Sequence, residues 1–406
     1  MSPSYTVTST TGYGSRIGNS LKWIVGWFIL LIGWIILLWW NENNFVEQKA
    51  ALEETESQTV ETSADKIDTT LNNGVVYINW ETSSTDETVL RDETFWVESN
   101  DLKLIRKVEM YQWEEEEHTE TEDNLGWSQT TTTTYTYNKV WKDYPIDSSK
   151  FQKSSEYVNP QWKYEEETYA KDPILLWAYT LTTAYVNMLN DEKALSLSWQ
   201  NIVAISWMQQ LDNLLYFWND MSNPEIGDMK ISFYTVKTWK ASAVGQQVNE
   251  TLRPYMTSNH RSISLLEQGD VPVYELFAHA YDANSLMTWI LRWVGFLLLW
   301  IAFSMIFSII DTLADVVPFI WNIVGAATGL VTFCLALIVW ILTVVIAWLA
   351  VRPIYGIIGL VAIIAIICWM VYMKKKHPRE ELPAKEGKKE SHEEPKKDDE
   401  PEIIEA

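Results

Sequence analysis

Cysteine is almost absent from this 406-residue chain, which holds only Cys334 and Cys368, both inside long apolar runs. Disulfides stabilise domains that lack a sufficient core, and structural zinc sites rely on thiolates. Disulfides therefore cannot staple the polar part of the chain, and zinc would find no thiolates there. We expect packing alone to hold its fold.

Catalytic signatures are scarce as well. The polar part has no G-x-S-x-G or H-E-x-x-H motif. Asp220 and Asp228 with His260 could form an acid/base group, but such residue types occur in any domain of this size. Residues 114–118, four glutamates and His118, could be a metal patch, although alternation along a strand sends neighbouring side chains to opposite faces. We interpret that run as a solvated strand tip and expect no enzyme, cofactor or metal site.

Long apolar runs, by contrast, are present in two places, at residues 23–40 and 293–373. About 20 apolar residues in a helix cross a hydrocarbon core of about 30 Å. Residues 41–285, between the runs, are then a domain tethered to a membrane at both ends.

The acidity of the chain belongs to this middle domain. Residues 41–285 hold 41 Asp and Glu against 18 Lys and Arg, a balance equal to the net charge of −23 of the whole chain. An acidic surface repels phosphates. Nucleic acid and anionic lipid headgroups are therefore not expected as direct partners of the domain.

The first run could be a cleaved signal peptide or a permanent anchor. Bulky residues before Asn41 lack the small-x-small pattern of a cleavage site, which favours an anchor. Arg16 and Lys22 precede the run and Glu42 follows it. The positive-inside tendency then puts residues 1–22 in the cytoplasm, a transmembrane helix at 23–40, and the domain of residues 41–285 on the exoplasmic (lumenal) side.

The C-terminal apolar region predicts further spans at 293–310, 330–351 and 354–373. Pro318 and the small-residue stretch 325–329 mark a break, so that 311–329 forms a cytoplasmic or interfacial connection that could also be re-entrant. Five spans would place the lysines at 374–376 outside, whereas four spans keep them in the cytoplasm. The charged tail, 374–406, is predicted to be disordered.

Within the domain, periodicity predicts an α+β fold with an antiparallel sheet. Residues 102–121 and 127–141 form the strongest hairpin candidate, in which Tyr135, Tyr137 and Trp141 share one face. The other predicted strands are 74–80, 88–97, 229–235 and 262–266. Helices are predicted at 45–61, continuing the first span, at 174–189, and at 273–281, leading into the second span.

Aromatic residues mark both membrane borders of the domain. Trp39 and Trp40 close the first span, and Trp289 and Trp293 flank Arg292 before the second. Indole rings favour the bilayer interface, and an arginine there can reach headgroup phosphates. We expect these residues to anchor both tethers at one depth.

Several segments of the chain form a recognisable set of motifs. The first comprises Val108, Glu109, Met110, Tyr111, Gln112 and Trp113, and Asn159-Pro160 follows later. Residues 224–233 contain Gly227 and Asp228, Asn284 and Trp289 precede the second span, and Arg352-Pro353 precede the last. In order and spacing these segments resemble the LUMA family (transmembrane protein 43), and residues 224–233 look like its P-E-[VI]-G-D-x-[KR]-[VI]-S-F segment.

The resemblance implies an integral membrane protein with four transmembrane α-helices and a large lumenal domain. It implies residence in the endoplasmic reticulum and inner nuclear membrane of a eukaryote, or in the plasma membrane of a bacterium. It also implies self-association and the organisation of membrane protein assemblies, and it carries over no catalytic residue.

Three functions remain open from the sequence. A scaffold would contact other membrane proteins, form homo-oligomers and lie against membrane lipids. A lipid-handling or membrane-homeostasis protein would co-purify with lipid. An enzyme would need polar residues that converge in a deep cleft.

Overall fold

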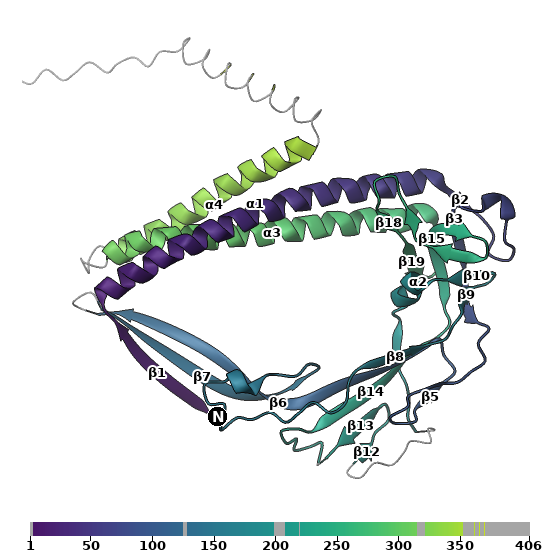
Figure 1. Cartoon of the computed structure of the whole chain (residues 1–406), viewed down its shortest axis with the longest axis horizontal. Coiled ribbons are helices and arrows are strands. Elements are labelled where there is room, and N and C mark those ends of the chain that lie inside the picture. Colours follow the sequence, from purple (N-terminus) through teal and green to yellow (C-terminus); the bar gives the residue numbers. More distant parts are fainter. Residues whose placement is uncertain are drawn as a thin grey trace, which may run out of the picture. The chain divides into compact units, whose positions relative to one another are not determined.

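The computed structural model of the chain (Figure 1) describes residues 3–124, 128–198, 208–218, 220–314 and 321–351, together with positions 361, 365 and 369. The chain divides into two units, residues 1–351 and 352–406. Only those three single positions of the second unit are described. The predicted fourth span and tail therefore lie almost wholly outside the described residues, and the first unit is considered below.

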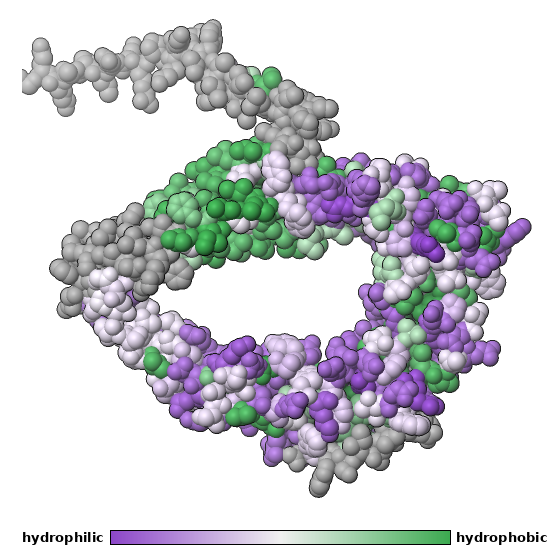
Figure 2. Space-filling view, in the orientation of Figure 1, coloured by the Kyte–Doolittle hydropathy of each residue, from purple (hydrophilic) through white to green (hydrophobic). Residues whose placement is uncertain are grey.

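Three long helices carry the apolar runs, and all are apolar enough to cross a membrane within the part of the chain that the structure describes. They are α1 (Tyr13–Gln58), α3 (Val273–Ala314) and α4 (Trp321–Val351). Figure 2 shows hydrophobic surface over the stretch where these three helices run together, and a mainly hydrophilic surface over the sheets and the domain-side end of α1. Membrane-spanning helices beside a sheet-rich domain are what the hydropathy pattern predicts.

Helix α1 is one unbroken rod of 46 residues. At a rise of 1.5 Å per residue it is about 69 Å long, roughly twice the thickness of a hydrocarbon core. The prediction that the helix after Asn41 continues the first span is therefore confirmed. Good helix formers such as Ala50, Ala51 and Leu52 keep the rod helical beyond the apolar run.

The connection after the second span differs from its prediction. Helix α3 continues past residue 310 to Ala314, and α4 passes through residues 325–329 without a break. Glycine and alanine in an apolar helix do not interrupt its hydrogen bonds as proline does. Only residues 315–320, which include Pro318, lie outside the described chain between these helices.

Two large sheets form the rest of the unit. The first has the strand order β1-β7-β6-β14-β13-β12, and β8 and β11 pair with β6 and β14. Its strands are β1 (Ser4–Thr11), β6 (Lys103–Asp123), β7 (Gln129–Lys142), β8 (Glu167–Ala170), β11 (Glu192–Ala194), β12 (Met208–Gln210), β13 (Leu214–Phe217) and β14 (Met229–Val236). All of its pairings are antiparallel.

The second sheet has the order β19-β15-β16-β10-β9-β3-β2, with a further pairing of β15 to β3. Its strands are β2 (Thr59–Glu61), β3 (Val75–Ser84), β9 (Ile174–Leu176), β10 (Tyr179–Leu181), β15 (Lys240–Val248), β16 (Thr251–Arg253) and β19 (Leu265–Gln268). Only β10–β16 and β2–β3 are parallel. Short pairs β4 (Leu90–Arg91) with β5 (Glu98–Ser99) and β17 (Tyr255–Met256) with β18 (Ser262–Ile263) complete the strands among the described residues.

Strand β3 explains why the second sheet is buried on both faces. Val76 and Ile78 belong to one core, which also holds Tyr185 of the short helix α2 (Thr183–Met188). Val75 and Tyr77 point the other way. They pack with Leu52 of α1, and Leu276 and Phe277 of α3 belong to the same core. The domain-side half of α1 is thus part of the domain.

The predicted hairpin is confirmed as β6 and β7, paired from Met110↔Lys142 to Asp123↔Gln129. Tyr137 is buried, with 1% exposure, and stacks on Tyr157 at 3.8 Å between ring centroids. Strand β14 also matches its prediction. The turn of the hairpin, at 125–127, lies outside the described residues.

Three other elements differ from prediction. Residues 174–189 form β9, β10 and then α2 instead of one helix, because Ile174, Leu176, Tyr179 and Leu181 bury alternate side chains in the second sheet. Of 88–97, only Leu90–Arg91 is a strand. Residues 262–266 divide between β18 and β19, which belong to different sheets.

Strand β1 precedes α1 and pairs with the hairpin (Figure 1). The register runs antiparallel from Ser4↔Thr136 to Thr11↔Gln129. Sequence periodicity gave no sign of this strand, since its serines and threonines lie before the apolar run like an ordinary polar leader.

Candidate functional site

The domain meets the apolar helices at a polar junction between α1 and α3. The Arg292 guanidinium donates to both Glu42 carboxylate oxygens, at 2.7 and 2.8 Å. One helical position earlier, the Asn41 amide donates to the Thr288 carbonyl at 3.2 Å. We call these four residues the junction clamp.

The charged pair of the junction clamp is almost completely buried from solvent. The Glu42 side chain is 1% exposed and that of Arg292 is 13% exposed. A buried carboxylate is costly unless it is paired and hydrogen-bonded, and a two-pronged arginine contact satisfies both oxygens at once. The pair therefore fixes the rotation and the register of α1 against α3.

The third apolar helix joins at the same level. Trp340 of α4 donates its indole N–H to the Arg292 carbonyl at 2.9 Å, and its ring stacks on Trp293 at 5.9 Å. Below the clamp, Trp34 and Leu38 of α1 pack with Phe296 of α3. A Cβ on Gly295 would lie 3.0 Å from the Trp34 indole nitrogen, so a small residue is needed at this crossing.

The predicted interface anchors lie around the clamp. Trp39, Trp40, Trp289 and Trp293 are all exposed, as side chains at a lipid border would be. Arg292 differs from the expectation, because its guanidinium binds Glu42 and lies 4.7 Å from the ring centre of Trp289. Arg292 therefore serves the contact between α1 and α3.

Above the clamp, α1 is bonded to the turn between β17 and β18. Arg261 donates to Glu47 at 2.6 Å, and Ser258 N–H donates to Glu54 at 2.9 Å. The Asn259 amide donates to the Glu47 carbonyl at 2.8 Å. These bonds add to the shared core, so the rod of α1 is fixed to the domain along several turns.

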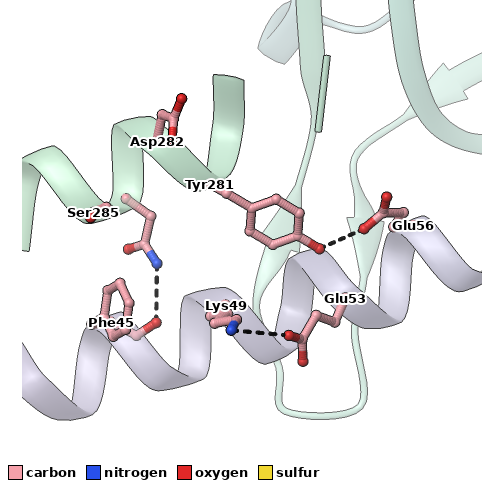
Figure 3. A pocket seen from close by; sticks show the side chains of 8 residues that line it. Phe45, Lys49, Glu53, Glu56, Tyr281, Asp282 and Ser285 are labelled. Carbon is pink, nitrogen blue, oxygen red and sulfur yellow. Dashed lines mark hydrogen bonds and ion pairs between the residues drawn. The ribbon is translucent and has the colours of Figure 1, made fainter. Parts of the chain in front are cut away.

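A groove lies on the domain side of the clamp, between α1 and α3 (Figure 3). It has a volume of about 480 Å³ and is lined by Phe45, Lys49, Glu53, Glu56, Tyr281, Asp282, Asn284 and Ser285. The Lys49 ammonium is 3.4 Å from Glu53, Tyr281 donates to Glu56 at 2.7 Å, and Asn284 donates to the Phe45 carbonyl at 3.1 Å. The groove thus combines one cation with several carboxylates beside aromatic rings.

The segments that carry the family resemblance meet elsewhere, in the first sheet. Met229 lies opposite Met110, and Ile231 opposite Val108, so β6 and β14 bring 108–113 and 224–233 together. Glu109 faces Lys230 in the same register. Gln112 is buried and bridges the Tyr144 carbonyl and the Ile146 N–H.

The backbone geometry around Gly227 and Asn159 explains why these residue types occur in the two segments. Gly227 has φ +98°, and a Cβ there would lie 2.9 Å from Pro160. Its N–H donates to the Tyr111 carbonyl at 2.9 Å, and Asn159 bonds both the N–H and the carbonyl of Trp113. These residues therefore have a structural role, because they fix the turn before β14 against strand β6.

Asp228 is buried at the end of this turn and accepts hydrogen bonds from the Tyr216 hydroxyl and the Glu225 N–H, at 2.5 and 2.9 Å. Burial, and then the Asp228 carboxylate, raise the pKa of Tyr216. Asp220 instead caps the turn at Ser222, and His260 lies in the turn beside α1. In the described part of the chain, no hydrogen bond or ion pair joins these three predicted acid/base candidates.

The glutamates of 114–118 take separate partners along β6. Glu114 pairs with Lys142 at 2.9 Å, Glu115 accepts from the Gln152 N–H at 2.6 Å, and His118 lies 3.4 Å from Glu120. Among the described residues, no group of three or more metal-ligating side chains converges. Arg352 and Pro353 of the resemblance lie outside the described residues.

Comparison with known proteins gives one consistent result. A family model described as Transmembrane protein 43 matches residues 110–353. The "Transmembrane protein 43 homolog" of Drosophila melanogaster is 27% identical over 67% of this chain and 74% of the fly protein. "Transmembrane protein 43" of Homo sapiens is 26% identical over 66% of this chain and 70% of the human protein, and the Mus musculus protein 27% over 66% and 69%. No solved structure matches.

Proposed function

From the premise that this chain belongs to the transmembrane protein 43 family and is an integral membrane protein, we propose that it is a non-catalytic scaffold that organises membrane protein assemblies. Its partners are other membrane proteins, further copies of itself and the surrounding lipids. The assembly takes place on the exoplasmic side, in the endoplasmic reticulum or inner nuclear membrane of a eukaryote or at the plasma membrane of a bacterium.

One observation carries this proposal: α1 contributes to a core among the apolar helices and to a core inside the domain, through Leu38 and Leu52 respectively. A continuous helix transmits orientation, since its hydrogen bonds do not allow a hinge without a break. The junction clamp then removes the remaining freedom of rotation between α1 and α3. A domain held in this way presents one fixed face to partners in the same bilayer, which a scaffold requires.

The proposal is tested by isolating crosslinked complexes from membranes that hold the parent chain or a clamp variant. In Glu42→Gln/Arg292→Gln both charges are removed together, so that no unpaired charge remains at the junction. We expect this variant to insert and fold but to recover fewer partner membrane proteins at equal expression. Equal recovery from parent and variant would contradict a role for the fixed orientation.

A lipid-handling role is the second candidate, and the groove favours it. Phe45 and Lys49 lie one to three turns above Trp40 on α1, close to where lipid headgroups reach. This function predicts that lipid co-purifies with the parent and is reduced in Lys49→Met, with Lys66→Met as a control outside the groove. A scaffold without lipid handling predicts equal lipid in both variants.

A further inference from the structure

The groove between α1 and α3 holds its charges in a definite order along α1. Figure 3 shows the side chains one after another on this helix, from Phe45 to Glu56. Counted from Trp40 at a rise of 1.5 Å per residue, Lys49 lies about 14 Å and Glu56 about 24 Å along α1. The cation of the groove is therefore nearer to the apolar part of the helix than the carboxylates of Glu53 and Glu56.

The membrane-side end of the groove is neutral and lies at the level of lipid headgroups. Phe45 is five residues beyond Trp40, about 8 Å along the helix. Ser285 is four residues before Trp289, about 6 Å along α3. The headgroup layer adds about 5–8 Å to each side of the hydrocarbon core. A lipid of the leaflet beside the domain therefore reaches this end of the groove from its place in the bilayer.

We propose that the groove binds the headgroup of phosphatidylethanolamine, with the phosphate beside Lys49 and the primary ammonium beside Glu53 and Glu56. In this lipid the phosphate adjoins the glycerol and the ammonium lies further out. The headgroup thus repeats the order of charges in the groove with the signs reversed, so that each charge of the lipid faces an opposite charge of the protein. The inference rests on the lipid-handling role, the second candidate above, and names its ligand.

The existing ion pair explains why a zwitterion fits better than a simple ion. The Lys49 ammonium is 3.4 Å from Glu53, and their side chains are 45% and 59% exposed. A bare anion would compete with Glu53 for the lysine and would be repelled by the acidic domain. A bare cation would compete with Lys49 for the glutamate. A zwitterion brings one charge for each partner and leaves neither of them unpaired.

The carboxylates favour ethanolamine over choline. A primary ammonium has three N–H donors, as in lysine, whereas a quaternary ammonium has none. Glu53 and Glu56 are three residues apart and therefore neighbours on the helix surface. The Tyr281 hydroxyl donates to Glu56 at 2.7 Å and holds this carboxylate at the groove. Hydrogen bonds between charged groups are the strong ones, and only the ethanolamine headgroup can donate them here.

The test uses the full chain in bilayer nanodiscs with equal amounts of palmitoyl-oleoyl phosphatidylethanolamine and phosphatidylcholine. Native mass spectrometry identifies the lipids that stay bound after release from the disc. We expect ethanolamine lipid to be enriched about tenfold, the ratio that one further hydrogen bond to a charged group gives. Equal binding of both lipids would overturn the headgroup assignment and leave lipid handling intact. The absence of bound lipid would overturn both.

A charge swap separates the order of the charges from their presence. In Lys49→Glu/Glu53→Lys the net charge and the ion pair are kept, and an acid four residues before a base suits a helix well. This variant should fold like the parent but lose the preference for ethanolamine lipid. Glu275→Gln, also on α3 but outside the groove, is the control for loss of a charge and should keep the preference.

Two results would overturn the proposal even if lipid is bound. One is a swapped variant that still prefers ethanolamine lipid, because the order of charges would then have no effect. The other is binding of free phosphoethanolamine as tight as that of the lipid, which would assign the groove to a soluble ligand instead of the membrane.

Discussion

Removal of the Glu42 charge should weaken the junction clamp far more than the removal of an exposed charge nearby. In Glu42→Gln the shape of the side chain is kept, but Arg292 becomes a nearly buried cation without an anion. Loss of one partner from a buried pair costs about 3–5 kcal/mol, whereas exposed pairs are worth about 0–1 kcal/mol. Because glutamine still accepts one hydrogen bond, we expect about 3 kcal/mol.

The control is on the same helix. Lys49 and Glu53 form an exposed pair at 3.4 Å, with side chains 45% and 59% exposed. Glu53→Gln should therefore change stability by less than about 0.5 kcal/mol. At about 2–4 °C per kcal/mol for a domain of 150–250 residues, Glu42→Gln should lower the unfolding midpoint by roughly 6–12 °C.

Tryptophan fluorescence during thermal unfolding in detergent measures both variants against the parent. The double variant Glu42→Gln/Arg292→Gln should recover much of the loss, since it leaves no unpaired charge. If Glu42→Gln unfolded at the same temperature as Glu53→Gln, the pair would not be a buried clamp and the argument would fail.

Other perturbations test other parts of the fold. Tyr137→Ala should destabilise the hairpin sheet by about 3–5 kcal/mol in chemical denaturation, and an unchanged midpoint would remove this ring from the core. Gly245→Ala should cost about 1–3 kcal/mol, because its Cβ would lie 2.0 Å from the buried Tyr185 hydroxyl; wild-type stability would contradict that packing. Hydrogen bonds from Thr70 lower the pKa of Asp68, so its charge stabilises the fold above its usual pKa, and that contribution is lost as pH falls through the lowered value. The stability difference between parent and Asp68→Asn should accordingly shrink as pH falls below about 3.9, the ordinary pKa of aspartate, and a constant difference would exclude the linkage.

Local periodicity was sufficient for elements whose side chains alternate or repeat over many residues. The hairpin has a long period-two pattern ending in Tyr135, Tyr137 and Trp141, and the helical composition after Asn41 predicts the continuation of α1. The prediction of one helix at residues 174–189 was wrong, because two short buried strands contain enough apolar residues to resemble a helix. Their strand character comes from pairing with β3 and β16, which are distant in sequence.

The junction clamp does have a signal in the sequence. Glu42 lies two residues after the end of the first apolar run and Arg292 directly precedes the second, so opposite charges lie at matching ends of two helices. Their pairing could have been predicted from that symmetry. Trp340 gave no comparable signal, because it lies inside an apolar run with many other tryptophans, and its contact with the Arg292 carbonyl depends on the packing of α4.

The central claim is that α1 crosses the bilayer and enters the domain as one rod, and the sidedness of two single cysteines tests it most directly. Tyr5→Cys and Thr131→Cys, each without Cys334 and Cys368, are labelled in sealed vesicles with a membrane-impermeant maleimide. The account predicts that the reagent reaches Tyr5→Cys only from the cytoplasmic face and Thr131→Cys only from the opposite face. Labelling of both positions from the same face would contradict it.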